Sequence, residues 1–82
     1  MNTPLTEPII HGKYRHYRNG RLYQVIALAR HSETHEPIVV YQAQYTSEEF
    51  GHQQMWVRPQ AMFLESVLHE GKHVPRFVFE GM

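Results

Sequence analysis

The densest group of side chains that could carry out chemistry lies between residues 30 and 36. The segment reads Arg30-His31-Ser32-Glu33-Thr34-His35-Glu36, so histidines and carboxylates crowd a short stretch of chain. Imidazole and carboxylate groups bind several divalent metals, and a histidine oriented by a carboxylate can act as the general base for a serine nucleophile. An acid–base or metal-dependent enzyme centred on this loop is therefore one hypothesis.

The local geometry of the same loop argues against that chemistry. Adjacent residues on an extended strand point to opposite faces, so His31 and Ser32 diverge unless a tight turn reverses them. No third anchoring motif, such as a helical His-Glu-x-x-His, is present to fix metal ligands. The simpler interpretation is a solvated turn whose Ser and Thr hydroxyls satisfy backbone groups. We expect no metal site and no cofactor.

A second group of side chains surrounds Trp56 and Arg58, which lie two residues apart and share one face of a strand. Arginine and aromatic side chains anchor interfaces, stack on bases and bind anions. In the alternative interpretation, Trp56 is a core residue and Arg58 pairs with Glu65. The neighbours that we expect around Trp56 and Arg58 in a closed barrel are Tyr14, Arg15, Tyr17 and Arg76. The candidate binding residues of both groups are Arg30, His31, Glu33, Tyr41, Trp56, Arg58 and Arg76.

Short strands separated by turns must position these groups. Asn19-Gly20 between two apolar runs predicts a hairpin with a type I′ turn, which needs positive φ at both residues. The nearly continuous apolar run from Leu22 to Ala29 predicts a central strand covered on both faces. The polar loop after it reads as a second hairpin connection that ends at Pro37. From Ile38 to Thr46 the side chains alternate, with Val39, Tyr41, Ala43 and Tyr45 on one face.

The second half of the chain predicts shorter elements. Residues 47–54 break the pattern, and Met55 to Arg58 then reads as a short strand that is stopped by Pro59. Residues 59–63 can form one helical turn. A turn around Gly71 separates two further extended segments, and in the last of them we expect Phe77 and Phe79 to point inward.

Length and these elements together predict one domain. A chain of 82 residues is long enough for one modest core. Five or six short strands favour a fold that hides its edges by closing on itself. We therefore predict an all-β, five- to six-stranded, SH3-like barrel with one short helical turn over residues 11–82. Residues 1–10 are expected to be a flexible N-terminal arm.

Composition restricts the classes of function. Eight Lys and Arg are balanced by eight Glu, which gives a formal net charge of zero with neutral His, unlike the basic excess of most nucleic-acid binders. Cysteine is absent, so disulfides, zinc thiolate sites and thiol nucleophiles are excluded. The sequence shows no secretory h-region and no apolar run long enough to span a membrane. We expect a cytoplasmic protein.

Several separated motifs resemble one known family. They are Gly12-Lys13-Tyr14-Arg15-His16-Tyr17, Ala29-Arg30-His31-Ser32-Glu33-Thr34, Val39-Val40-Tyr41, Trp56-Val57-Arg58-Pro59 with Met62-Phe63, and Val74-Pro75-Arg76-Phe77. In this order they resemble the small bacterial domain of unknown function 1653, from about Gly12 to about Phe79. The resemblance implies a compact bacterial domain, and it implies no activity, cofactor or catalytic residue.

Three classes of function follow, and one of them is a purely structural protein or a subunit of a larger assembly. The first is a non-enzymatic binding module that presents Arg and aromatic side chains to a protein, a peptide or a single-stranded ligand, with nucleic acid disfavoured by the zero net charge. The second is the enzyme centred on Arg30-His31-Ser32-Glu33, with a homo-oligomer as one way to complete its site. Convergence of these side chains on one concave face would favour a functional site.

Overall fold

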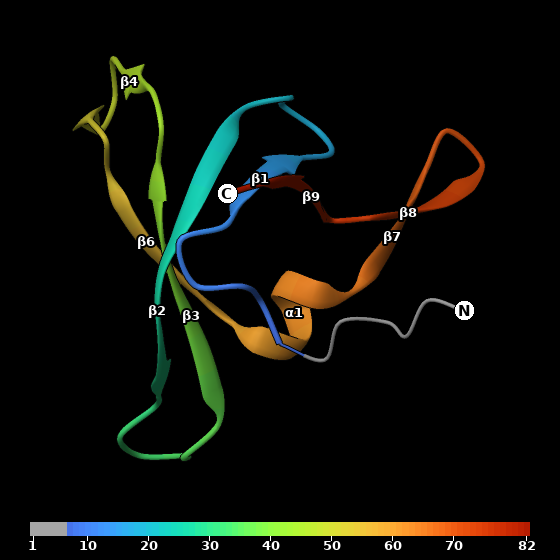
Figure 1. The fold of residues 1–82 in the computed structure, drawn as a ribbon. Coiled ribbons are helices and arrows are strands. Elements are labelled where there is room, and N and C mark those ends of the chain that lie inside the picture. Colours follow the sequence, from blue (N-terminus) through green and yellow to red (C-terminus); the bar gives the residue numbers. More distant parts are fainter. Residues whose placement is uncertain (1–6) are drawn as a thin grey trace.

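The computed structural model describes residues 7–82, and Figure 1 shows their arrangement. The elements in chain order are β1 (Lys13–His16), β2 (Leu22–Arg30), β3 (Pro37–Ala43), β4 (Thr46–Ser47), β5 (Gly51–His52), β6 (Met55–Pro59), α1 (Gln60–Leu64), β7 (Ser66–His69), β8 (Lys72–Pro75) and β9 (Phe77–Gly81). The predicted all-β fold with one short helix is confirmed, and the helix begins one residue after the Pro59 at which we placed it.

Five strands form one antiparallel sheet in the order β6-β3-β2-β1-β9. Within residues 7–82 no strand pairing joins β6 to β9, so the predicted barrel is not closed and its SH3-like character is not confirmed. The chain between these two edge strands forms α1 and the separate β7–β8 hairpin, which projects away from the sheet (Figure 1). No residues are left there to form a strand that could bridge the edges.

The first hairpin turns at the predicted place but with a different turn type. Gly20 has a φ of 67°, whereas Asn19 does not have a positive φ, so the predicted type I′ turn is wrong. The backbone N–H of His16 donates to the carbonyl of Arg21, which leaves four residues in the loop. The Asn19 carboxamide accepts from the Arg21 backbone N–H at 2.7 Å and so stabilises the wider turn.

The apolar run of β2 is not covered on both faces. Tyr23 and Val25 are buried, while the residues between and after them are more exposed. The register with β3 shifts between Val25 and Ala27, which marks a bulge that contains Ile26, and Ile26 is 37% exposed. A bulge re-aims the side chains of one strand, and a run of apolar residues gives no warning of it.

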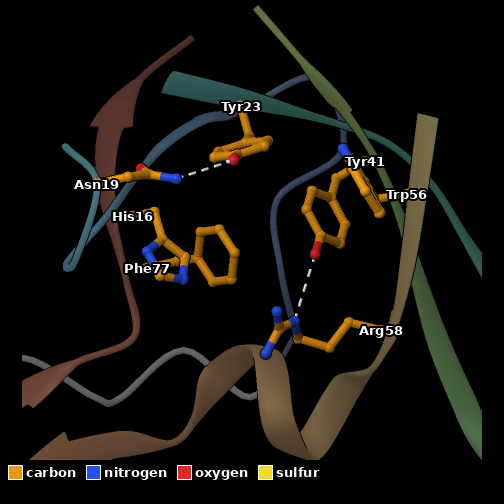
Figure 2. Close-up of a pocket in the computed structure, with 7 residues that line it drawn as sticks. All are labelled: His16, Asn19, Tyr23, Tyr41, Trp56, Arg58 and Phe77. Carbon is orange, nitrogen blue, oxygen red and sulfur yellow. Dashed lines mark hydrogen bonds between the residues drawn. The ribbon is translucent and has the colours of Figure 1, made fainter. Parts of the chain in front are cut away.

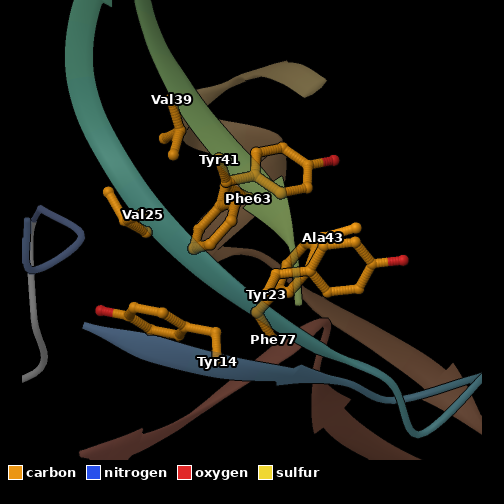
Figure 3. Packing of buried hydrophobic residues seen from close by; sticks show 8 residues of the cluster. All are labelled: Tyr14, Tyr23, Val25, Val39, Tyr41, Ala43, Phe63 and Phe77. Carbon is orange, nitrogen blue, oxygen red and sulfur yellow. The ribbon is translucent and has the colours of Figure 1, made fainter. Parts of the chain in front are cut away.

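The alternation predicted along β3 is confirmed, since Val39, Tyr41 and Ala43 are all buried. These side chains meet a core built mainly of aromatic rings, which Figure 3 shows. Phe63 from α1 stacks on Phe77 from β9 with ring centroids 4.2 Å apart. The predicted inward orientation of Phe79 is only partly met, because its side chain packs beside Tyr14 and remains 39% exposed.

The predicted N-terminal arm lies partly outside the described residues, which begin at Glu7. In the described part, Pro8 is buried, and the backbone N–H of Ile9 donates to the Tyr14 hydroxyl at 3.0 Å. None of the helices in residues 7–82 has the length and hydrophobicity needed to cross a bilayer.

Candidate functional site

Three of the predicted binding residues come together at one cavity. Tyr41, Trp56 and Arg58 line a cavity of about 220 Å³ between the two edge strands of the sheet (Figure 2). The other lining residues are His16, Asn19, Tyr23 and Phe77. Five of the seven side chains carry aromatic rings, and none carries a carboxylate.

The register of β6 on β3 explains why Trp56 and Arg58 reach this cavity. Trp56 pairs with the buried Tyr41, and Arg58 pairs with the buried Val39, so both side chains project from the inner face of the sheet. Successive side chains of a strand alternate between faces, which sends Val57 outward. The shared face that we predicted for Trp56 and Arg58 is therefore confirmed.

The guanidinium group of Arg58 is held by aromatic side chains. Its Nε donates to the Tyr41 hydroxyl at 3.3 Å, and its Cζ lies 5.8 Å from the centroid of the Phe77 ring. Figure 2 shows the group reaching from β6 toward the middle of the cavity. Within residues 7–82 none of the ion pairs involves Arg58, so the alternative interpretation that it pairs with Glu65 is wrong.

Glu65 pairs instead with Arg76, the fourth predicted residue near this region. Arg76 also donates from Nε to the carbonyl of Met62 at 2.9 Å, which ties the chain before β9 to α1. Its side chain is not among those that line the cavity. Arg76 therefore has a structural partner, and Arg58 is the arginine that faces the cavity.

The neighbours expected around Trp56 lie elsewhere. Tyr14 belongs to the core, and Arg15 forms an ion pair with Glu80 with an Nε–Oε1 distance of 3.2 Å. The Tyr17 ring contacts His69, with centroids 5.3 Å apart. These predicted neighbours do not line the cavity.

His16 supplies the imidazole of the cavity. Burial lowers its pKa below the ordinary value of 6.5, and the positive charges of Arg58, Arg76 and Arg18 lower that pKa further. The backbone N–H of Arg18 donates to His16 Nδ1 at 3.1 Å. Because Nδ1 acts as an acceptor, the neutral ring carries its proton on Nε2 and keeps one N–H donor.

A chain of hydroxyl groups fixes the rim of the cavity. Asn19 Nδ2 donates to the Tyr23 hydroxyl at 3.2 Å, and the Tyr23 and Tyr45 hydroxyls lie 2.6 Å apart. Burial and the hydrogen bond with Tyr23 raise the pKa of Tyr45 to about 12. Figure 3 shows the Tyr23 and Tyr41 hydroxyls leaving the core on the side opposite to that of Tyr14.

Arg30, His31 and Glu33 do not join this site. All three are exposed at the β2–β3 hairpin loop, which extends from the far end of the long strands in Figure 1. His31 Nδ1 accepts from the backbone N–H groups of Glu33 and Thr34 at 3.1 and 3.3 Å, so this nitrogen shapes the turn. Among residues 7–82, no three His, Asp or Glu side chains gather closely enough to hold a metal ion.

Four lining residues were not identified from the sequence, namely His16, Asn19, Tyr23 and Phe77. Tyr23 and Phe77 lie at strand positions whose side chains point inward, and buried core residues occupy the same kind of position. Strand alternation alone therefore does not distinguish a residue of the cavity wall from a residue of the core. His16 lies directly before the first hairpin loop and Asn19 lies within it. The pairing of β1 with β9 at His16 and Phe77 brings that loop to the cavity.

Comparisons with known proteins agree with the motifs in the sequence. Residues 12–79 match the model of a family described as protein of unknown function (DUF1653). The chain is similar to a DUF1653 protein of known crystal structure from Bordetella bronchiseptica, with 34% identity over 89% of this chain and 88% of that one, and a TM-score of 0.75. No protein with a curated description matches the chain. The match extends over most of the chain and includes the Trp56-Val57-Arg58-Pro59 motif of the cavity. The chain belongs to the DUF1653 family.

Proposed function

We propose that this domain is a cytoplasmic, non-enzymatic binding module whose ligand places an anionic group in the cavity beside Arg58. The observation that carries the proposal is the Arg58 guanidinium, which has no carboxylate partner among residues 7–82 and faces a cavity with largely aromatic walls. Ligand sites in proteins are concave and apolar, with a few polar groups that set orientation and specificity.

The surroundings of Arg58 suit the binding of an anion better than those of a charged side chain that is merely exposed to solvent. The bond from Nε to Tyr41 and the Phe77 ring restrict the side chain before a ligand arrives, so less conformational entropy is lost on binding. The terminal amino groups of a guanidinium suit the geometry of carboxylate and phosphate oxygens. His16, whose neutral ring keeps one N–H donor, also lines the cavity.

The ligand that we infer joins an anion to an apolar or planar group. The cavity is smaller than most drug-sized sites, which span about 300–1,000 Å³, so it holds one such group and not a whole extended ligand. 3-Phenylpropionate and phenyl phosphate reproduce this combination with a carboxylate and a phosphate, respectively. They are suitable probes because both place the anion close to an aromatic ring.

Arg58→Ala tests the proposal. We expect saturable shifts of the Trp56 indole and His16 ring NMR signals with one of the two probes, and at least about tenfold weaker binding in Arg58→Ala. Arg58→Lys should weaken binding less, because it keeps the charge and loses only the planar fork. Stability should change by no more than about 1 kcal/mol, since Arg58 has no ion pair to break.

Arg15→Ala is the matched control, because Arg15 is an arginine of β1 that pairs with Glu80 and does not line the cavity. It should bind both probes as tightly as the unmodified protein. Equal binding in Arg58→Ala, or shifts that never saturate, would show that Arg58 is not the anion site.

A further inference from the structure

A second cavity adjoins the first. It has a volume of about 230 Å³ and is lined by residues that include Tyr45, Glu49, Phe50, Gln54 and Trp56. Trp56 lines both cavities, so the two share one wall residue. The Tyr23 hydroxyl of the first cavity also lies 2.6 Å from the Tyr45 hydroxyl of the second.

We propose that the two cavities are neighbouring subsites of one groove that binds an extended peptide, with the peptide's C-terminal carboxylate at Arg58 and an upstream apolar side chain beside Phe50. The inference rests on the proposed function and deepens it, because it names the ligand class and adds a second subsite. C-terminal carboxylate capture and the docking of alternate side chains in pockets are established modes of peptide recognition.

Phe50 gives the second cavity its apolar character. Its side chain is 48% exposed, and its ring lies edge-on to the Trp56 indole with centroids 4.9 Å apart. The Phe50 backbone N–H donates to Ser47 Oγ at 2.9 Å, which fixes the loop that presents the ring. An exposed aromatic ring held in place beside a cavity loses little entropy when it covers a ligand side chain.

The charges along the groove favour a peptide over a nucleic-acid strand. Arg58 is the charged wall residue at one end, and Glu49 is the charged wall residue at the other. A single strand carries a phosphate at every nucleotide, so its backbone would meet Glu49 with like charge. A peptide with one terminal carboxylate places its only anion at Arg58. The zero net charge of the chain points the same way.

The main chain of such a peptide has a neighbour on the protein. Trp56 and Arg58 belong to β6, which is an edge strand of the sheet and pairs only with β3 among the described strands. An extended segment can add to a strand edge through backbone hydrogen bonds. Side chains two residues apart on such a segment lie about 6.6–6.8 Å from each other, which suits adjacent subsites.

The test is a titration of four probes monitored by Trp56 fluorescence and calorimetry. The probes are acetyl-Leu-Ala-Ala with a free C-terminal carboxylate, its C-terminal amide, acetyl-Ala-Ala-Ala with a free carboxylate, and hexathymidine. We expect the first peptide to bind most tightly and amidation to weaken it about tenfold. Amidation should have no effect in Arg58→Ala, because the same interaction is then already lost.

Phe50→Ala isolates the second subsite. The substitution should weaken the binding of acetyl-Leu-Ala-Ala several-fold, so that this peptide binds no more tightly than acetyl-Ala-Ala-Ala. The affinities for acetyl-Ala-Ala-Ala and for 3-phenylpropionate should be unchanged. Leu68→Ala is the control, since Leu68 is an exposed apolar residue on the distant β7–β8 hairpin and should change none of these affinities.

The outcomes separate the two proposals. If the small anions bind through Arg58 while the Leu side chain and Phe50→Ala make no difference, the peptide groove is wrong and the anion site stands. If hexathymidine binds more tightly than the peptides and depends on Arg58, the ligand is a nucleic acid and the peptide inference is overturned. If no probe binds, the proposed function itself fails.

Discussion

At the scale of single residues, His16 is the group in the cavity whose charge depends most directly on its surroundings. It lies beside Phe77 and Tyr23, with ring centroids 5.0 and 6.4 Å away, and three arginine charges act on it. A proton added to this ring would place positive charge next to Arg58 in a partly desolvated space. The folded protein therefore keeps His16 neutral at pH values where an exposed histidine is protonated.

His16→Gln should reduce the loss of stability on acidification. Because the folded pKa of His16 lies below 6.5, the unfolded chain binds more protons than the folded one as the pH falls below that value. The contribution of His16 to stability is therefore present above about pH 6.5 and is lost as the pH falls toward the lowered folded pKa. Urea unfolding between about pH 7.5 and pH 5.5 gives the slope of the free energy of unfolding against pH for the unmodified protein and for His16→Gln.

The six other histidines are present in both proteins, so the difference in slope belongs to His16 and its contacts. His35→Gln, at the exposed β2–β3 loop, is the control and should keep the slope of the unmodified protein. Identical slopes in all three proteins would contradict the assignment.

The sequence predicted some of the residues that line the cavity. Trp56 and Arg58 could be placed on one face because strand alternation is a local rule, and Pro59 marks where that strand ends. Arg30, His31 and Glu33 were the denser cluster in the sequence, yet they stay at a loop tip. Density along the chain measures proximity in sequence, whereas a site requires convergence of residues that are distant in sequence, such as Arg58 and His16.

At the scale of elements, the turn before β1 shows how closely the backbone approaches its neighbours. The Gly12 backbone N–H donates to the carbonyl of Ile9, and its own carbonyl accepts from Val25. A methyl group at Gly12 would lie 2.8 Å from the Ile9 carbonyl oxygen and 2.9 Å from a ring carbon of Phe79. Gly12 is buried, and the Ile9 oxygen belongs to the backbone of the same turn, so it cannot move aside as the 39% exposed Phe79 ring can.

Gly12→Ala should therefore destabilise the fold by about 1–3 kcal/mol, as overpacking does in other buried sites. The free energy of unfolding from urea denaturation measures the effect. Gly71→Asn is the control, because a side chain at Gly71 meets no atom within 4 Å and asparagine tolerates its left-handed backbone conformation. If Gly12→Ala lowers the free energy of unfolding no more than Gly71→Asn does, the turn before β1 relaxes freely and the prediction is wrong.

The elements that sequence patterns predicted well are those governed by alternation and turn residues. The strand predicted from Ile38, the strand predicted from Met55 and the helical turn near Pro59 all follow from local preferences. The first of these strands ends at Ala43 and not at the predicted Thr46. The faces of β2 and the type of the first turn did not follow. The bulge at Ile26 depends on pairing with β3, and the wider loop depends on the hydrogen bonds that Asn19 forms with Arg21 and Tyr23.

At the scale of the whole molecule, one side chain of the short helix joins it to the sheet. Phe63 is 1% exposed, and its ring contacts Tyr14 of β1, Tyr41 of β3 and Phe77 of β9. A five-residue helix is too short to be stable alone, so its position depends on this packing.

Phe63→Ala should lower the free energy of unfolding by about 3–5 kcal/mol, because it removes a fully buried ring and leaves a cavity among three strands. Met62→Ala on the same helix is the control, since Met62 is exposed and should change stability by less than about 0.5 kcal/mol. Guanidinium unfolding measures both. Equal effects would show that the helix does not anchor the core.

The fold class followed from the spacing of strands and turns, but the closure of the sheet did not. Whether β6 meets β9 is decided by how α1 and the β7–β8 hairpin use residues 60–76, and this is a matter of tertiary packing. The open seam between the edges is also where the cavity lies. The error in the predicted barrel and the position of the candidate site therefore have the same cause.

The separation of the cavity walls along the chain also constrains when the cavity can form. His16 and Phe77 face each other across the pairing of β1 with β9, which closes the longest loop of the sheet. We expect such contacts to form late, because the entropy of closing the loop is lost before their energy is gained. On the ribosome, every other wall residue emerges before Phe77. Nascent chains shorter than this can form the β2–β3 hairpin, but they have no cavity in which a ligand could bind.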